Sequence, residues 1–265
     1  MNLALQGLMA KRTRGPAEPV TWTQRSSNFG GYIVDVAYGN SVWVAVGQNA
    51  KLVTASDPTS TWTQRTSSFT EGEIIEGVAY GNSLWVAVGQ NSELATASDP
   101  TSTWTQETSS FSTTINNVAY DGSTNWVAVA GSGELATSTS PTGTWTQRTS
   151  SFDTSGIDNV AYGGTTWVAV GDSGKLATST SPTGKWTQRT SSFSTTRIKG
   201  VAYGNGVWVA VGHTGKLATA LDPTGTWTQR TSSFETTSIR SVAYGNGVWV
   251  AVGLNSKLAT AVNGA

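Results

Sequence analysis

The stretch that decides the fold is VAYGNGVWVAVG, which occurs at residues 201–212 and again, unchanged, at residues 242–253. Two apolar runs rich in Val, Tyr and Trp flank a Gly-Asn-Gly turn signal, and this combination predicts a β-hairpin. The Trp of the second run recurs six times, at intervals of 41 or 42 residues, as Trp43, Trp85, Trp126, Trp167, Trp208 and Trp249. The chain is therefore an array of six related units.

A second tryptophan series marks another strand in each unit. These residues precede Thr-Gln at intervals of 40 to 42 residues and are Trp22, Trp62, Trp104, Trp145, Trp186 and Trp227. In the fifth unit the pattern predicts four short strands, separated by Gly-rich and Asp-Pro turns, over residues 198–203, 207–211, 216–220 and 226–230. Four such strands, repeated six times, predict an all-β fold: a six-bladed β-propeller with four antiparallel strands per blade. A linear solenoid is the alternative, but the terminal units lack the polar caps that it needs.

The ends of the array predict how the ring closes. The array begins with the fourth strand of a unit, at residues 21–25, and it ends after a third strand, at residues 257–261. We expect the N-terminal strand to complete the last blade, because closure removes the sheet edges of an open array. The predicted division is an N-terminal extension over residues 1–20 and the propeller over residues 21–265.

The composition excludes several classes of function. The 265 residues contain 16 Lys+Arg and 16 Asp+Glu, so the neutral chain lacks the broad charge that binds nucleic acid or an anionic membrane. No apolar run approaches the roughly 20 residues of a membrane span. With no Cys and 1 His, thiolate and multi-His metal sites are excluded as well. We expect no cofactor, no metal, no nucleic-acid partner and no membrane partner.

Two segments, Ser-Asp-Pro-Thr-Ser-Thr-Trp at residues 56–62 and at residues 98–104, resemble the Asp-box turns of sialidase-type propellers. The Asp stands five residues before the Trp as in that motif, whereas the Gly, where present, is displaced by one position. The repeated wording W-T-Q-R-T-S-S-F and V-A-Y-G-N-G is also similar to repeat propellers in bacteriophage virion and tail proteins. Both resemblances imply the propeller fold, and the second implies a structural role in a virion or in an extracellular location.

The resemblance to sialidases does not extend to their catalysis. Those enzymes use three clustered arginines, a Tyr nucleophile and a free Asp, which break the symmetry of their propeller. Here the arginines after W-T-Q and the tyrosines of V-A-Y are repeated at equivalent positions, as scaffold residues are. Two units replace the Asp of the turn by Ser140 and Ser181. Asp and Ser both accept backbone N–H bonds in turns, but Ser cannot replace a general base, so the sequence predicts no catalytic residues.

Two positions differ from unit to unit in otherwise similar blades. The first follows the Ile of the innermost strand and is occupied by Val34, Glu76, Asn116, Asp158, Lys199 and Arg240. The second follows the W-V-A-V strand and is occupied by Gln48, Gln90, Gly131, Asp172, His213 and Leu254. The connections of a propeller place both sets on one face, near the mouth of the central channel. We predict that this face binds a ligand or a partner, because function on a rigid scaffold concentrates in such loops. Neutral drift after recent duplication is the alternative.

The N-terminal extension is the other asymmetric part of the chain. Residues 1–10 are mostly apolar and residues 11–16 are basic, which is the reverse of the order in a secretion signal. We expect this segment to dock the propeller on a larger protein assembly, such as a virion, through the apolar anchor residues Leu3, Leu5, Leu8 and Met9. A disordered tail is the alternative.

These observations favour a non-catalytic structural or recognition module. One rival hypothesis is a carbohydrate-binding lectin, whose glycan would bind between blades or on the variable face and which should expose a Trp in each blade. The other is an engineered or recently amplified scaffold without a selected ligand. In such a scaffold the differences between blades should fall at random positions, without preference for one face.

Overall fold

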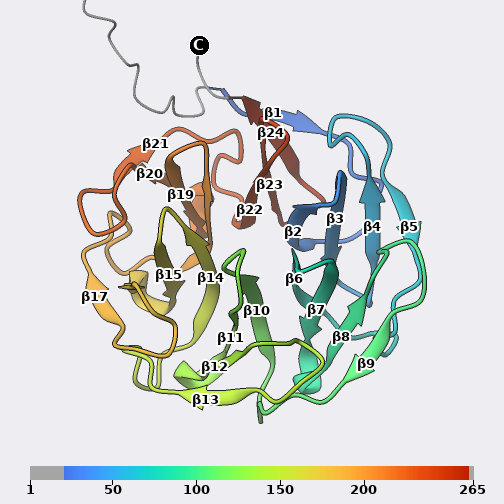
Figure 1. Ribbon diagram of the computed structural model, residues 1–265. Coiled ribbons are helices and arrows are strands. Elements are labelled where there is room, and N and C mark those ends of the chain that lie inside the picture. The colour runs from blue at the N-terminus through green and yellow to red at the C-terminus, as the bar shows by residue number, and fades with distance from the viewer. Residues whose placement is uncertain (1–20, 263–265) are drawn as a thin grey trace, which may run out of the picture.

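The computed structural model describes residues 21–262, which form six four-stranded antiparallel sheets around a central channel (Figure 1). The six-bladed propeller predicted from the repeat is therefore confirmed. The predicted N-terminal extension, with Leu3, Leu5, Leu8 and Met9, lies outside the described residues. Among the residues that are described, no helix is long and apolar enough to cross a membrane.

Each blade runs outward from the channel in four strands. The innermost strands are β2 (Ile33–Gly39), β6 (Ile75–Gly81), β10 (Ile115–Tyr120), β14 (Ile157–Gly163), β18 (Ile198–Gly204) and β22 (Ile239–Gly245). The second strands are β3 (Val42–Gly47), β7 (Leu84–Gly89), β11 (Trp126–Ala130), β15 (Thr166–Gly171), β19 (Val207–Gly212) and β23 (Val248–Gly253). We number the blades 1 to 6 in this order.

The third strands are β4 (Leu52–Ala55), β8 (Leu94–Ala97), β12 (Leu135–Ser138), β16 (Leu176–Ser179), β20 (Leu217–Ala220) and β24 (Leu258–Val262). The outermost strands of blades 1 to 5 are short: β5 (Thr63–Arg65), β9 (Thr105–Glu107), β13 (Thr146–Arg148), β17 (Thr187–Arg189) and β21 (Thr228–Arg230). In blades 2 to 5 a single 3-10 turn joins the second strand to the third: η1 (Gln90–Ser92), η2 (Gly131–Gly133), η3 (Asp172–Gly174) and η4 (His213–Gly215).

Blade 6 is completed by the start of the described chain. Strand β1 (Thr23–Arg25) pairs antiparallel with β24, with Thr23 opposite Thr260 and Arg25 opposite Leu258. The sheet order β1-β24-β23-β22 confirms the predicted closure of the ring by the N-terminal strand. Closure gives β24 a partner on each side, so its backbone groups are not left at an open edge.

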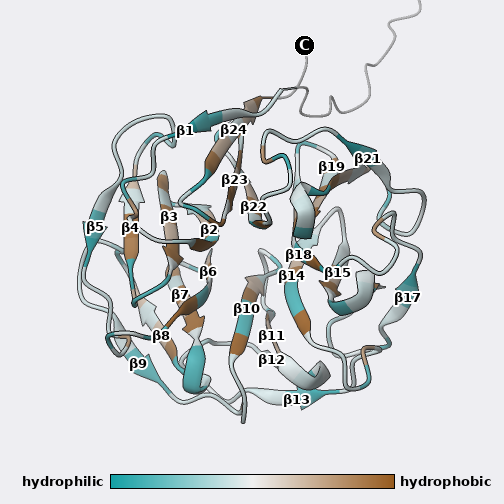
Figure 2. Cartoon of the chain, turned by 180° about the vertical axis from the view of Figure 1, so that it is seen from behind, coloured by the Kyte–Doolittle hydropathy of each residue, from teal (hydrophilic) through white to brown (hydrophobic). Residues whose placement is uncertain are grey.

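The core lies between blades, and the second strands are its centre. Their W-V-A-V residues are buried on both faces, as the unbroken apolar run predicted, because each sheet is covered by a blade on either side. Figure 2 shows the hydrophobic segments of these strands in brown. All twelve tryptophans are buried, and Trp22, the most exposed of them, shows 8% of its surface. The tyrosines of V-A-Y are partly buried at the edge of the core, and the ring of each lies with its centre 4.8 to 5.1 Å from that of the Trp of its own blade.

Repeated polar residues hold the blades and turns together. The Gln of W-T-Q reaches a neighbouring loop, as where Gln106 Nε2 donates to the Ser68 carbonyl at 2.9 Å. The following Arg donates from Nε to a Thr hydroxyl of the third strand, as Arg65 does to Thr54 at 2.9 Å. In the Asp-box-like turn, Asp57 Oδ1 accepts hydrogen bonds from the backbone N–H and hydroxyl of Thr59, both at 2.8 Å. These residues repeat because the same hydrogen bonds between strands, loops and turns are formed in successive blades.

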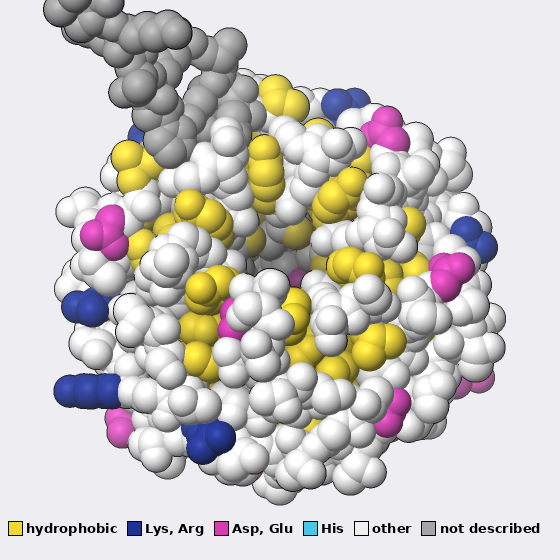
Figure 3. All heavy atoms as spheres, viewed as in Figure 1, with side chains coloured by type: hydrophobic (Ala, Val, Ile, Leu, Met, Phe, Trp, Pro, Cys, Tyr) yellow, Lys and Arg dark blue, Asp and Glu magenta, His cyan; other side chains and the backbone are white. Residues whose placement is uncertain are grey.

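The strand register defines two different faces. Ile33 at the start of β2 lies opposite Gly47 at the end of β3, so the connections after the second strand lie beside the starts of the innermost strands. We call this side the variable face; Figure 2 looks towards it. The opposite side, the uniform face, carries the Gly-Asn-Gly and Asp-Pro turns. Around its channel mouth hydrophobic side chains gather (Figure 3).

Candidate functional site

Every innermost strand has a β-bulge near its start, and the residue in each bulge is the variable one. In β2 the register with β3 shifts between Ile33 and Asp35, which leaves Val34 as the extra residue. The same shift occurs in the other five blades. A bulge leaves its extra residue out of the ladder and changes the direction of its side chain. Bulges thus explain how one position in each blade is released from sheet pairing.

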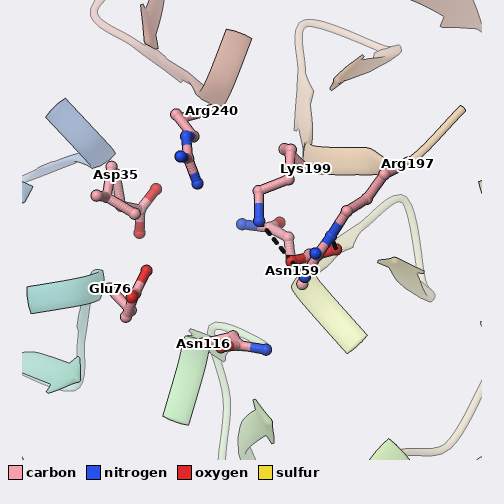
Figure 4. A pocket seen from close by; sticks show the side chains of 9 residues that line it. Asp35, Glu76, Asn116, Asn159, Arg197, Lys199 and Arg240 are labelled. Carbon is pink, nitrogen blue, oxygen red and sulfur yellow. Dashed lines mark hydrogen bonds and ion pairs between the residues drawn. The ribbon is translucent and has the colours of Figure 1, made fainter. Parts of the chain in front are cut away.

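The six bulge residues meet in one cavity at the variable mouth of the channel, with a volume of about 240 Å³ (Figure 4). The structure therefore brings together the whole first set predicted from sequence: Val34, Glu76, Asn116, Asp158, Lys199 and Arg240. Three further residues line the cavity that the sequence analysis did not select, namely Asp35, Asn159 and Arg197. Asp35 and Asn159 each follow a bulge residue at a position that also differs between blades, and that variation was the available signal.

The positions after the bulges form an inner ring that ties neighbouring innermost strands together. Asp35 Oδ2 accepts a hydrogen bond from the Val78 backbone N–H at 2.8 Å, and Asn117 Nδ2 donates to the same oxygen at 3.0 Å. The Ser241 hydroxyl, from the neighbouring blade 6, donates to Asp35 Oδ1. Asp35 thereby connects blades 1, 2, 3 and 6.

The electrostatics of Asp35 follow from its position. Its side chain lies in the channel wall, and only 4% of the residue surface is exposed. Burial raises the pKa of Asp35 to about 6, although the hydrogen bonds from Ser241 and Val78 favour the charged form and limit the rise. Asp35 therefore loses its proton at a higher pH than an exposed Asp does, and it connects four blades.

An ion network occupies one side of the cavity. Asp158, with a side chain 2% exposed, receives a bidentate pair of bonds from Arg197 at 2.6 and 2.7 Å and a third from Lys199 Nζ at 2.7 Å. Arg197 Nε also lies 3.0 Å from Asp172 Oδ1. The hydrogen bond with Asp158 raises the pKa of Arg197, whereas burial lowers the pKa of Lys199 against the attraction of Asp158. Two carboxylates and two cations thus neutralise one another.

The other two charged residues stand apart from this network. Glu76 of β6 and Arg240 of β22 both point into the cavity (Figure 4), and neither forms an ion pair or a side-chain hydrogen bond with any residue of the described chain. The Arg240 guanidinium lies 5.6 Å from the centre of the Tyr32 ring. Burial raises the pKa of Glu76, and Lys199 and Arg240 act in the opposite direction. The cavity therefore presents one carboxylate and one guanidinium to a ligand.

The second variable set is more dispersed. None of its members lines the cavity, and Asp172 alone among them reaches the ion network, through Arg197. Gln90 Oε1 accepts the backbone N–H of Ile74 at 3.0 Å, and Asp172 Oδ2 accepts that of Gly156 at 3.0 Å, so these side chains fasten loops of their own blades. Burial lowers the pKa of His213, and the nearby cations add to the effect. Gln48, Gly131 and Leu254 occupy the corresponding loops of their blades.

The chemistry available at the cavity is that of polar recognition. Residues 21–262 contain no group of three or more His, Cys, Asp or Glu side chains placed to hold a metal ion. The carboxylates of Asp35 and Asp158 are engaged in hydrogen bonds or ion pairs with the scaffold. Opposed charges and an amide, Asn116, line the rest of the cavity, which suits a polar ligand with charges of both signs.

Comparison with known proteins supports the fold. No family model matches the chain, and no curated protein matches its sequence. A structure of YCF48 bound to D1 peptide is similar to it with a TM-score of 0.65 and 14% identity, over 93% of this chain and 100% of that one. YCF48 from Cyanidioschyzon merolae gives a TM-score of 0.62 and 12% identity, over 92% of this chain and 99% of that one. These likenesses establish a shared propeller architecture; the sialidase-type and phage resemblances stay interpretations of the sequence.

Proposed function

We propose that the chain is a non-catalytic protein-binding module that receives a peptide segment of its partner at the variable mouth of the channel. One observation carries the proposal: the positions at which the blades differ in charge converge, through six equivalent bulges, on a single polar cavity. A rigid ring that varies at its functional rim is a common way to build a binding site. Fold alone assigns no function, so the proposal rests on the site.

Two further observations support a binding role. Differences between the blades of an unselected scaffold should have no preferred place, whereas the first variable set gathers in one cavity. In addition, the similar propeller YCF48 has been seen bound to a peptide, which is consistent with peptide binding by this architecture.

The rival hypotheses have less support. A lectin with an exposed Trp in each blade does not fit, because no Trp of the chain exposes more than 8% of its surface. The hypothesis that the chain is part of a phage virion rests on the resemblance of its sequence motifs alone. Docking of residues 1–20 on a larger assembly is a separate proposal, which a version lacking residues 1–18 would test by loss of capture without loss of stability.

The proposed site is tested by blocking it. Random linear peptides would be selected for binding to the full chain, and their affinity would then be measured for two variants. Asn116→Trp places a large ring in the cavity, whereas Thr226→Trp places the same ring on the uniform face, at an exposed position that is Lys185 in blade 4. We expect selected peptides to bind Asn116→Trp at least 10-fold more weakly and Thr226→Trp unchanged.

The outcome is decisive when both variants melt at the temperature of the parent chain. Peptides that bind both variants equally well, or a selection that enriches no peptide, would contradict the proposal. Weaker binding to Thr226→Trp alone would move the site to the uniform face.

A further inference from the structure

Asp35 accepts hydrogen bonds from three other blades, and the remaining charged groups around the cavity divide into a satisfied set and an unsatisfied pair. Asp158 and Asp172 neutralise Arg197 and Lys199 at distances of 2.6 to 3.0 Å. That set needs no ligand. Glu76 and Arg240 remain, and within the described chain neither has a partner of opposite charge in contact.

The guanidinium of Arg240 has an unused hydrogen-bond donor. Its Nε is buried and has no hydrogen-bond partner among the described residues. A buried donor without an acceptor is unfavourable, so each such group calls for a physical explanation, and a bound acceptor is one. The Cζ atom of Arg240 lies 5.6 Å from the centre of the Tyr32 ring. The guanidinium points into the cavity (Figure 4). Its planar fork of N–H groups matches a carboxylate.

Glu76 provides the complementary half. It comes from β6, and Arg240 comes from β22, so blade 1 separates the two and their side chains approach the cavity from different directions (Figure 4). From the intervening blade, the Val34 side chain is apolar, and the Asp35 carboxylate is hydrogen-bonded to other blades and forms no ion pair with Arg240. Because these two opposite charges do not pair with each other, a ligand with the reverse arrangement of charge can pair with both.

We propose, building on the peptide-binding function above, that the cavity recognises a peptide segment carrying one acidic and one basic side chain close together in sequence. The acidic side chain binds the guanidinium of Arg240. The basic side chain binds the carboxylate of Glu76. Asn116, whose Nδ2 donates to the Ile157 carbonyl at 2.8 Å, retains its amide oxygen to accept an N–H of the bound segment.

The first experiment observes Arg240 directly. The full chain, labelled with 15N, is titrated with the blocked dipeptide acetyl-Arg-Glu-amide while the Nε–H resonance of Arg240 is followed by NMR. We expect a saturable shift, which the uncharged analogue acetyl-citrulline-Gln-amide does not produce. The resonance is assigned with Arg240→Gln. An Nε–H signal that stays unchanged at saturating dipeptide would overturn the proposal, as would an equal response to the uncharged analogue.

The second experiment assigns each charge to its partner. Peptides selected on the full chain are remade with the acidic residue changed to its amide or the basic residue changed to its neutral isostere. We expect removal of the acid to weaken binding at least 10-fold to the parent chain but less than 3-fold to Arg240→Gln. Removal of the base should show the same contrast between the parent chain and Glu76→Gln. Equal losses on parent and variant would contradict the pairing.

These results separate the two proposals. Peptides that need an open cavity, as judged by Asn116→Trp, but that lack an acid–base pair would overturn the charge pairing and leave peptide binding standing. A free amino acid that competes as well as the peptide would replace the peptide by a small zwitterion and overturn the inference. Peptides indifferent to Asn116→Trp would overturn both.

Discussion

The two ends of the same innermost strand obey different constraints. At the variable mouth the bulge residue leaves the ladder and lines the cavity, and its identity ranges from Val34 to Glu76 to Arg240. At the uniform mouth the strand ends in Tyr-Gly in five of the blades. There the Gly of one blade packs against the Tyr of the next: a Cβ added to Gly81 would lie 2.3 Å from Tyr120 Cδ1.

This difference shows that uniformity and variation have separate physical causes. The Tyr–Gly contact recurs around the ring, so any side chain at the Gly would collide with the neighbouring aromatic ring. The bulge residues share no contact that recurs in every blade, so no single residue type is imposed on all six, although Asp158 and Lys199 pair with each other. The exception supports the argument, since blade 3 replaces the Gly by Asp121 and needs a longer turn, in which Asp121 Oδ1 accepts three backbone N–H bonds at 2.8 to 3.0 Å.

We expect the largest effect from a substitution that breaks the ion network at the variable mouth. Asp158→Asn leaves Arg197 and Lys199 partly buried without their shared counter-charge, and we expect a loss of about 4 kcal/mol in the free energy of unfolding. The measurement is urea denaturation at pH 7. The matched control is Asp153→Asn, because Asp153 is 87% exposed and lies 3.8 Å from Lys175; it should change stability by less than about 0.5 kcal/mol. Similar values for the two variants would mean that the network contributes little.

The next largest effect should come from disrupting the Gly–Tyr packing between blades at the uniform mouth. Gly81→Ala forces Tyr120 to move, and overpacking of this kind should destabilise the chain by about 2–3 kcal/mol. Gly225→Ala is the control: its nearest neighbour would be 3.6 Å away, so we expect a small change. The two variants are compared by thermal unfolding. If Gly81→Ala melts with the control, close packing is not what keeps this mouth uniform.

The third prediction concerns Asp35, which lines the cavity at the variable mouth. Here, unlike in the two preceding predictions, we expect the substitution to increase stability. Since the folded state raises the pKa of Asp35 from 3.8 to about 6, the unfolded chain loses this proton first. Stability should therefore fall as pH rises from about 4 to 6 and then level off, by about 3 kcal/mol at most.

Asp35→Asn removes this titration while its amide oxygen still accepts the bonds from Val78 and Asn117. We expect this variant to be more stable than the parent by about 2 kcal/mol at pH 8 and equal to it near pH 4. Urea titrations at both pH values provide the measurement. A constant difference between parent and variant would show that Asp35 does not titrate in this range.

Sequence reasoning reached the fold because the repeat is redundant. Six copies of each strand and turn, and an extra strand at residues 21–25, determine blade number and closure without any contact being known. It also selected the bulge residues, since comparison of the blades isolates them. It did not find the bulge, because an extra residue in one strand is visible only against the register of its partner. Arg197, which precedes Ile198, was also left out; its position differs between blades too, but only the structure shows that it joins Asp158 to Asp172.

The smallest expected effect is the sharpest test of the comparison. Glu76 and Arg240 carry charge at the variable mouth but hold no ion pair in the described chain, so neutral isosteres should leave the scaffold intact. We expect Glu76→Gln and Arg240→Gln each to change the free energy of unfolding by less than about 0.5 kcal/mol. A loss above 2 kcal/mol for either would place that residue in the scaffold, like Asp158. Unchanged stability together with altered peptide binding would instead show that the propeller keeps its binding residues on one mouth and its packing residues on the other.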